Sequence, residues 1–258
     1  MTQGLAELLA FSQSSITEAF LVFLRVGAVM AVLPVFGERS IPERVRLVLA
    51  IAFTAVVFPA VAIEVQGLAA TSQGLMRGLA TEVMAGLVLG LALRLFVMVL
   101  QIAGSMVAQS TSLSQIFGGG AVDAQPAIGH LFLVAGLALA VMLGLHVRVA
   151  ELLILSYQFF PAGMYLPKED VLTWGVNHIA KAFALSFSLS APFLIASLVY
   201  NVALGVINRA MPALMVAFVG APAISLGGLL LLFVSAPILL ELWQTGFAEL
   251  LLNPFQVR

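Results

Sequence analysis

The sequence predicts an all-α protein that lies in or against a membrane, and three observations support this. Of its 258 residues, 62% are apolar and only 9% are charged, whereas a soluble domain carries about 25% charged residues. Stretches without any charge exceed the roughly 20 residues that a membrane-spanning helix needs. Small residues recur at four-residue spacing, which is typical of closely packed membrane helices. We therefore expect about six long apolar helical segments.

Charge-free runs define the clearest of these segments. Residues 124–147, 182–208 and 210–240 contain no formal charge and each run is longer than about 20 residues, so each predicts a membrane span. The run 47–63 is shorter and marginal. In chain order, the six expected segments are residues 16–36, 47–63, 78–107, 127–147, 180–207 and 213–250.

The first and third segments contain ionisable residues, which are costly in a bilayer. A charge at mid-bilayer costs about 2.5–3.5 kcal/mol on insertion scales, and such residues usually face protein or water. Glu18 and Arg25 are seven residues apart and therefore share a helix face. Either Glu18 lies at the interface while Arg25 snorkels or pairs locally, or the first segment contacts protein neighbours in place of lipid.

The loops show no bias of positive charge that would orient six simple crossings. One side would carry Arg39, Arg44, Arg46 and Arg209, and the other Arg77, Arg148, Lys168, Lys181 and Arg258. This balance indicates that not every segment is an ordinary helix surrounded by lipid.

Glycine and proline predict how the segments pack. Pairs such as Gly86 and Gly90, four residues apart, allow two backbones to approach closely. Pro192, Pro222 and Pro237 fall within the last two segments and can kink or break a helix, because proline removes a backbone donor. We therefore expect kinked spans or hairpins there.

The residue chemistry excludes several classes of function. With 11 basic and 12 acidic residues, the net charge is −1 and offers no basic patch for nucleic acid. The absence of cysteine excludes disulfides, thiolate chemistry and cysteine-ligated metals. The first 15 residues lack a basic region, so they do not read as a cleaved signal peptide.

No catalytic, cofactor or metal site is predicted. His130 and His146 share a segment but are too far apart for a ligand pair. The triplet Gly118, Gly119 and Gly120 lacks the lysine and hydroxyl residue of a phosphate-binding loop. The sequence thus indicates a protein that is not an enzyme.

Residues 105–126 form an unusual segment, polar and rich in serine and glycine yet nearly uncharged. Non-helical backbone at membrane depth is tolerated only where it is buried in protein or lines an aqueous cavity. The segment is either an exposed loop or a pore-facing, re-entrant one, and its low charge favours the second.

Three stretches together resemble the FliR family of the flagellar type III export apparatus. The first runs from Arg25 through Pro34 and Pro42 to Arg46, the second covers Gly104 to Ser114, and the third runs from Asn201 through Arg209 to Pro222. The resemblance covers residues 15–250. The related virulence-type export proteins share the pattern, so injectisome use is the alternative to flagellar use.

The resemblance implies a non-enzymatic subunit of an export gate in the bacterial inner membrane, at the flagellar basal body. Its kinked helical hairpins would join a membrane-associated helical assembly with FliP and FliQ, near FlhB and FlhA. Residues 1–178 would be FliP-like and include the 105–126 plug loop, and residues 179–258 would be a FliQ-like hairpin. Unfolded export substrates would pass through the channel, and other components would supply the energy.

For the channel plug, the resemblance combined with residue chemistry singles out nine positions. Among them, the flexible thioether of methionine would seal the channel, and the glycines would act as hinges. The nine positions are Met106, Gln109, Ser110, Leu113, Ser114, Phe117, Gly118, Gly119 and Gly120. Subunit contacts are expected at Arg39, Arg44, Arg46 and Arg209, for which interfacial anchoring is the alternative.

Two other functions remain open at this point. A secondary transporter would place broken helices around a small-molecule site and needs polar groups at mid-depth, for which Glu82 and Arg94 are the available residues. A structural scaffold would share the partners but line no pore.

Overall fold

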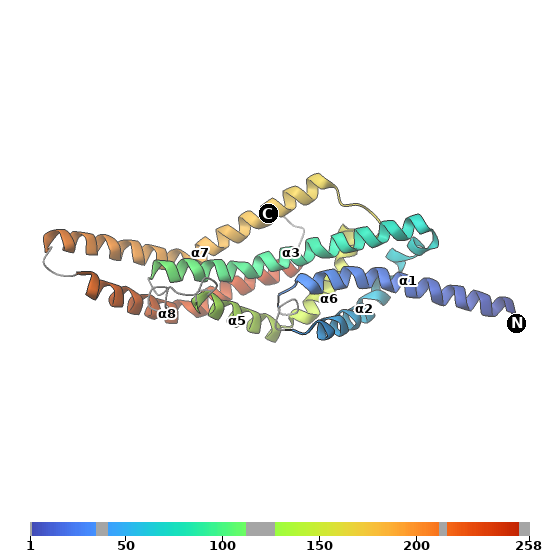
Figure 1. Cartoon of the computed structure of the whole chain (residues 1–258), viewed down its shortest axis with the longest axis horizontal. Coiled ribbons are helices and arrows are strands. Elements are labelled where there is room, and N and C mark those ends of the chain that lie inside the picture. Colours follow the sequence, from blue (N-terminus) through green and yellow to red (C-terminus); the bar gives the residue numbers. More distant parts are fainter. Residues whose placement is uncertain (1, 35–40, 112–126, 212–215, 253–258) are drawn as a thin grey trace. The chain divides into compact units, whose positions relative to one another are not determined.

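The computed structural model describes residues 2–34, 41–111, 127–211 and 216–252. Within these ranges every regular element is helical, which confirms the predicted all-α class (Figure 1). The elements are α1 (Thr2–Val32), α2 (Glu43–Val65), the short 3₁₀ helix η1 (Leu68–Ala70), α3 (Ser72–Ser110), α5 (Ala127–Met142), α6 (Leu145–Phe159), α7 (Lys168–Ala210) and α8 (Val216–Leu252).

Proline, glycine and hydroxyl residues set the helix boundaries. Pro42 precedes the first turn of α2, and Gly67 adopts a left-handed conformation (φ 79°) after that helix has ended. The Thr71 hydroxyl accepts a hydrogen bond from the Gly74 backbone N–H at 3.0 Å, which caps the start of α3. Helix α7 begins after Pro167 and carries Glu169 and Asp170 in its first turn, where the helix dipole favours negative charge.

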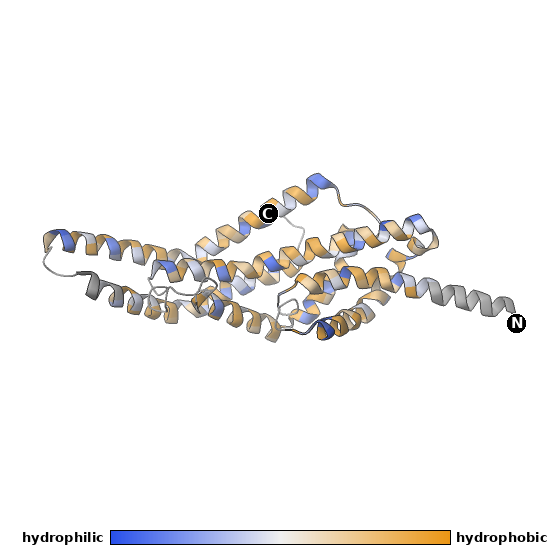
Figure 2. Cartoon of the chain, viewed as in Figure 1, coloured by the Kyte–Doolittle hydropathy of each residue, from blue (hydrophilic) through white to orange (hydrophobic). Residues whose placement is uncertain are grey.

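Among the residues that the structure describes, five helices are long and apolar enough to cross a membrane, and the bent pair α5–α6 adds a sixth if it counts as one span. Apolar residues cover most of their length (Figure 2). Helices α3, α7 and α8 have 39, 43 and 37 residues. At 1.5 Å per residue these helices are roughly 55–65 Å long, about twice the thickness of a hydrocarbon core.

The structure corrects the sequence-based expectations in two places. Residues 127–147 do not form one helix, because Gly144 takes a positive φ of 84° and separates α5 from α6. Helix α3 extends to Ser110, so the first residues of the segment 105–126 are helical. Pro192 in α7, and Pro222 and Pro237 in α8, lie inside helices that continue past them.

The chain divides into two compact units. Unit 1 comprises residues 1–95, 141–178 and 249–258, and unit 2 comprises residues 96–140 and 179–248. The predicted division into residues 1–178 and 179–258 concerns likeness to other subunits and stays a prediction.

Unit 1 is built from α1, α2, α6 and the first half of α3. Apolar side chains from all four helices are buried in its core, among them Val26, Val57, Leu89 and Leu152. Helix α1 lies very close to α3: a Cβ atom on Gly86 would stand 2.7 Å from the Cβ of Ala28. This approach confirms the close packing that the glycine spacing predicted.

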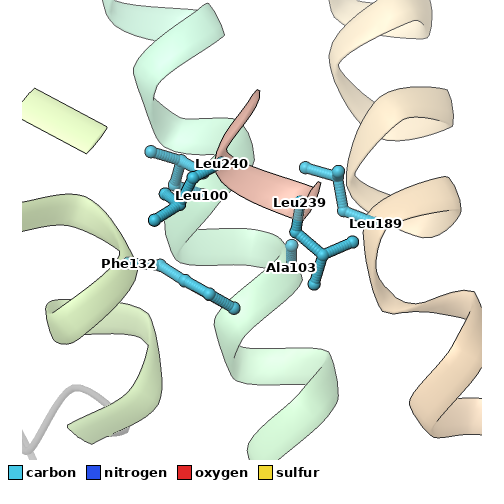
Figure 3. Close-up of a pocket in the computed structure, with 6 residues that line it drawn as sticks. All are labelled: Leu100, Ala103, Phe132, Leu189, Leu239 and Leu240. Carbon is cyan, nitrogen blue, oxygen red and sulfur yellow. The ribbon is translucent and has the colours of Figure 1, made fainter. Parts of the chain in front are cut away.

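In unit 2, the second half of α3 packs with α5, α7 and α8. Leu100 and Ala103 of α3 meet Phe132 of α5, Leu189 of α7, and Leu239 and Leu240 of α8 around an apolar seam that has no room for a water molecule (Figure 3). Gly104 of α3 faces Gly129 of α5 so closely that a side chain on Gly104 would overlap the Gly129 backbone.

An aromatic cluster joins α8 to α3 in the same unit. The fully buried Trp243 stacks on Phe247 with ring centroids 5.0 Å apart. Its indole N–H donates to the Phe96 carbonyl at 3.0 Å, which satisfies the one polar group of the ring.

Candidate functional site

The first polar centre is the Arg25 cluster, which we define as Arg25, Glu82, Ser156 and Tyr157 in unit 1. These side chains come from α1, α3 and α6, and none is more than 3% exposed. Arg25 binds Glu82 through two hydrogen bonds: its Nε donates to Oε2 at 2.8 Å and its Nη2 donates to Oε1 at 2.9 Å. A two-point contact of this kind is the strongest geometry that arginine makes with a carboxylate.

Helix α6 completes the Arg25 cluster. The Nη1 atom of Arg25 donates to the Ser156 hydroxyl at 3.0 Å, and Nη2 donates to the Phe160 carbonyl at 2.8 Å. The Tyr157 hydroxyl donates to Glu82 Oε2 at 2.9 Å, and its ring lies 3.6 Å from the guanidinium carbon. Because Phe160 is the C-cap of α6, the guanidinium also places positive charge at the negative end of that helix.

Glu18 forms a second contact on the same face of α1. Its Oε1 accepts hydrogen bonds from the Gly67 backbone N–H at 3.1 Å and from the Ser14 hydroxyl at 3.2 Å. Both ionisable residues of the first segment are thus buried against other parts of unit 1. The structure favours protein neighbours over snorkelling for Arg25, as the second alternative above expected.

The second polar centre lies in unit 2, at the C-terminal end of α3. The Ser197 hydroxyl of α7 donates to the Ser110 carbonyl at 2.6 Å, and the Ser225 hydroxyl of α8 donates to the Thr111 carbonyl at 3.3 Å. The last carbonyls of a helix have no partner within the helix, and in apolar surroundings they need one. Hydroxyl groups from two neighbouring helices supply it.

Serine side chains of α7 follow α3 upstream of this point. The Ser190 hydroxyl donates to the Met106 sulfur at 3.2 Å, and the Ser186 hydroxyl donates to the Val99 carbonyl at 3.3 Å. Ser186, Ser190 and Ser197 are four and seven residues apart, so they share one face of α7. This face fixes the register of α7 against α3.

A groove of about 320 Å³ lies between α7 and α8 beside the end of α3. The Tyr200 hydroxyl donates to the Gly220 carbonyl at 2.8 Å and ties the two helices together near the groove. The groove is lined mainly by apolar and small residues: Thr111, Phe193, Ala196, Ser197, Tyr200, Ala223, Ile224, Gly227, Gly228 and Leu231.

Three of the nine predicted plug residues fall in described parts of the chain. Met106 and Ser110 are partly buried at the end of α3 with the contacts given above, and Gln109 is exposed. The other six lie outside the described residues: Leu113, Ser114, Phe117, Gly118, Gly119 and Gly120. Met106, Gln109 and Ser110 thus belong to the last turns of α3, and their role in a plug stays a prediction.

The four arginines predicted to contact other subunits are not brought together by one element. Arg44 and Arg46 lie in the first turn of α2, exposed and partly exposed respectively, and Arg209 is exposed at the end of α7. Arg39 lies outside the described residues. Their role as subunit contacts stays a prediction.

No group of three His, Asp or Glu side chains that could hold a metal ion occurs in the parts of the chain that the structure describes. His130 and His146 are exposed, and His178 lies against Trp174 with ring centroids 4.1 Å apart.

Comparison with known proteins decides the family. The sequence profile of the family described as bacterial export proteins, family 1, matches residues 16–250, nearly the whole chain. The chain belongs to this family. Together with the relatives described next, this match confirms the likeness to FliR seen in the sequence.

Several members of the bacterial export family are similar to this chain over most of their length. The flagellar biosynthetic protein FliR of Caulobacter vibrioides is 34% identical over 235 residues, which cover 90% of this chain and 94% of that protein. FliR of Aquifex aeolicus is 28% identical over 247 residues, or 92% of each chain. FliR of Bacillus subtilis is 24% identical over 211 residues, which cover 78% of this chain and 79% of that protein.

Sequence reasoning missed the Arg25–Glu82 pair and the serine contacts at the end of α3. Arg25 and Glu82 are 57 residues apart, so no helical spacing connects them. The available signal was that each is an ionisable residue inside a predicted span, and such residues are rarely left without a partner.

Proposed function

We propose that this chain is a non-enzymatic subunit of the flagellar protein export gate, in the inner membrane at the flagellar basal body. It would form part of the channel wall, and residues 105–126 would form the plug that closes the channel to small solutes. Unfolded export substrates would displace the plug. FliP and FliQ are the proposed companions in the gate, with FlhB and FlhA nearby.

The end of α3 is the observation that carries the plug proposal. A plug must be held firmly where it begins so that its remaining residues return to one place after a substrate has passed. Ser197 and Ser225 hold the carbonyls of Ser110 and Thr111 from two different helices, directly before residue 112. The last described residues of the segment, Ser110 and Thr111, are therefore fixed beside the groove between α7 and α8.

The unpartnered apolar surface supports a subunit of a larger assembly. In an apolar 18-residue stretch of each helix, only 28% of α7 and 22% of α8 is buried within the chain. Large side chains such as Phe187, Leu198 and Phe233 are at least half exposed. Helices roughly twice as long as a bilayer core is thick cannot cover this surface with lipid alone, so companion subunits are the natural neighbours.

Flagellar use is favoured over injectisome use because the similar proteins above carry flagellar names. A secondary transporter would need a polar site open to a small solute. Glu82 is instead enclosed with its charge paired to Arg25, and Arg94 is exposed elsewhere on α3.

Deleting residues 110–120 tests the plug role. In membranes that contain the assembled gate, we expect the deletion to make the gate conduct small ions. The double variant Ser197→Ala/Ser225→Ala should leak less than the deletion but more than wild type, because it loosens the start of the segment and leaves the segment intact. Ion flux or single-channel conductance measures both.

Ser188→Ala provides the matched control, since Ser188 is exposed on the same helix and its hydroxyl donates only within α7, to the Ala184 carbonyl. This variant should stay closed. Unchanged conductance in the 110–120 deletion would refute the plug role and leave a scaffold that lines no pore.

A further inference from the structure

We propose that an exposed stripe on α3, in unit 1, binds one helix of a companion subunit, and that this helix is mostly apolar and carries an aspartate or glutamate opposite Arg94. We call it the α3 stripe, and it consists of Arg77, Ala80, Met84, Leu87, Leu91 and Arg94. The inference rests on the proposed function in one respect, because it takes companion subunits to exist. It adds the place where one of them binds and the chemistry that it presents there.

The spacing of the α3 stripe indicates that its occupant is a helix. Its exposed residues follow one another at intervals of three, four, three, four and three positions along α3. This is the spacing of the a and d positions through which two helices pack side by side. At 1.5 Å per residue the stripe is about 25 Å long, which corresponds to nearly five turns of a second helix.

The α3 stripe is also narrow. From Ala80 to Arg94, the residues directly before and after each exposed position are buried or partly buried. On α7, in contrast, neighbouring residues are exposed together, such as Phe183 and Ala184. Lipid or protein can cover a broad face of that kind, whereas a stripe one residue wide matches the ridge of a single helix.

The middle of the α3 stripe is apolar. Met84, Leu87 and Leu91 are between 38% and 51% exposed, so each has surface available for a partner. Removing such side chains from water is favourable, and the flexible thioether of methionine adapts to the shape of its neighbour. Ala80 is small and allows a second helix to approach closely. The middle of the stripe therefore favours apolar side chains on the partner helix.

Arg94 ends the α3 stripe with a positive charge. Its side chain is exposed and makes no ion pair or side-chain hydrogen bond with any residue that the structure describes. The residues three and four positions away are glycine, leucine, valine and methionine, so α3 offers it no carboxylate there. Glu82, the one acidic residue of α3, is already bound to Arg25. Because arginine binds carboxylates through paired hydrogen bonds, an aspartate or glutamate on the partner helix complements it.

Other neighbours satisfy only part of the α3 stripe. Water would leave its leucine and methionine side chains exposed, which is unfavourable. A lipid with an anionic head group would pair with Arg94, but its acyl chains would not require a stripe one residue wide with helical spacing. An apolar helix that carries one carboxylate satisfies the spacing, the apolar middle and the charge together.

Photo-cross-linking in the full-length chain tests the α3 stripe, because the chain has no cysteine and an introduced one is its only thiol. Leu91→Cys lies in the stripe, one turn before Arg94. Met164→Cys is the matched control, since Met164 is 64% exposed between α6 and α7. Particles purified in mild detergent are labelled with a maleimide that carries a benzophenone and are then illuminated. The wild-type chain corrects for thiols of other subunits.

We expect Leu91→Cys to form an adduct with a companion subunit, at least about fivefold more abundant than the adduct from Met164→Cys, because only the stripe holds a helix alongside the thiol. Mass spectrometry of the joined peptides identifies the attachment point. That peptide should belong to an apolar helix and carry an aspartate or glutamate within about two turns of the attachment point.

Charge variants in the Leu91→Cys background test the role of Arg94. Arg94→Glu should lower the adduct yield at least about fivefold, because it places two negative charges opposite each other, and Arg94→Lys should keep the yield within roughly threefold. Changing the acidic residue of the joined peptide to arginine should restore the adduct in Arg94→Glu, which distinguishes a lost ion pair from a misfolded chain. Arg148→Glu reverses the charge of a half-exposed arginine on α6 and should leave the yield unchanged.

The inference is overturned if Leu91→Cys gives no subunit adduct, if it joins lipid, detergent or a second copy of this chain, if the joined peptide has no acidic residue, or if Arg94→Glu leaves the yield unchanged. Where native mass measurement still finds FliP and FliQ in those particles, the proposed function stands and the α3 stripe alone is wrong. An adduct with an acidic, apolar helix of a protein outside the flagellar export apparatus would support the stripe and contradict the proposed function.

Discussion

Buried polar side chains of this protein act as fixed points between helices that are otherwise apolar. Arg25, Glu82 and Tyr157 bind one another inside unit 1, and Ser156 and the Phe160 carbonyl accept the remaining hydrogen bonds of Arg25. Removing one member of a buried ion pair typically costs about 3–5 kcal/mol, because the remaining charge is left without a partner. The serines along α7 have the same role with neutral groups, where each hydrogen bond between membrane helices contributes about 0.6 kcal/mol.

Tyr157→Phe isolates one bond of the Arg25 cluster. The variant keeps the ring beside the guanidinium and loses the hydrogen bond to Glu82 Oε2. Because a hydrogen bond to a charged group contributes about 1.5–3 kcal/mol, the free energy of unfolding of the purified protein in detergent should fall by roughly that amount.

Tyr165→Phe is the control for this variant. Tyr165 is 63% exposed, so the same chemical change there should leave the midpoint of denaturant-induced unfolding where it is. Equal effects of the two variants would show that the Tyr157 hydrogen bond contributes nothing specific.

At the scale of the elements, close backbone approach positions α1 on α3. A side chain on Gly86 would meet the Arg25 carbonyl and the Cβ of Ala28. Gly86→Ala should therefore lower the free energy of unfolding by about 1–3 kcal/mol, the usual cost of overpacking a tight interface. Thermal or denaturant unfolding followed by helical circular dichroism measures the loss.

Gly27→Ala makes the same substitution on α1 at a position where a Cβ atom would have nothing within 4 Å. We expect no loss there and a gain of up to about 1 kcal/mol, because alanine favours the helix more than glycine does. A Gly86→Ala variant as stable as Gly27→Ala would mean that the close α1–α3 approach does not stabilise the protein.

The long apolar segments could be predicted from the sequence because charge-free runs reveal them directly. Segments 16–36, 47–63, 78–107, 180–207 and 213–250 all overlap helices of the structure. Helix α6 was missed because Arg148 and Glu151 interrupt its apolar run, although its buried face, which includes Val149 and Leu152, recurs at helical spacing.

Contacts between distant residues could not be read from the sequence in the same way. The pairing of Arg25 with Glu82, and of Ser197 with the Ser110 carbonyl, depends on how α1, α3 and α7 pack. The spacing of residues within one helix does not indicate which helices pack together. Proline alone does not indicate whether a helix is kinked or ends, because neighbouring helices can satisfy the backbone groups that a proline frees in an apolar helix. Helices α7 and α8 therefore continue past Pro192 and Pro237.

At the scale of the whole molecule, the chain exposes more apolar surface than it buries along its two longest C-terminal helices. In the proposed export gate, companion subunits would cover this surface. The two polar centres stabilise different parts of the chain. The Arg25 cluster links α1, α3 and α6 within unit 1, and the serine contacts bind the end of α3, where the proposed plug lies.

The central claim is that these helices are completed by companion subunits. Extraction of the protein in mild detergent from cells that also make their own FliP and FliQ, followed by native mass measurement, tests this claim most directly. We predict particles several times heavier than the 27.2 kDa chain, which release FliP and FliQ when they are dissociated. A particle that contains only this chain, at 27.2 kDa and with its helices intact, would contradict the account.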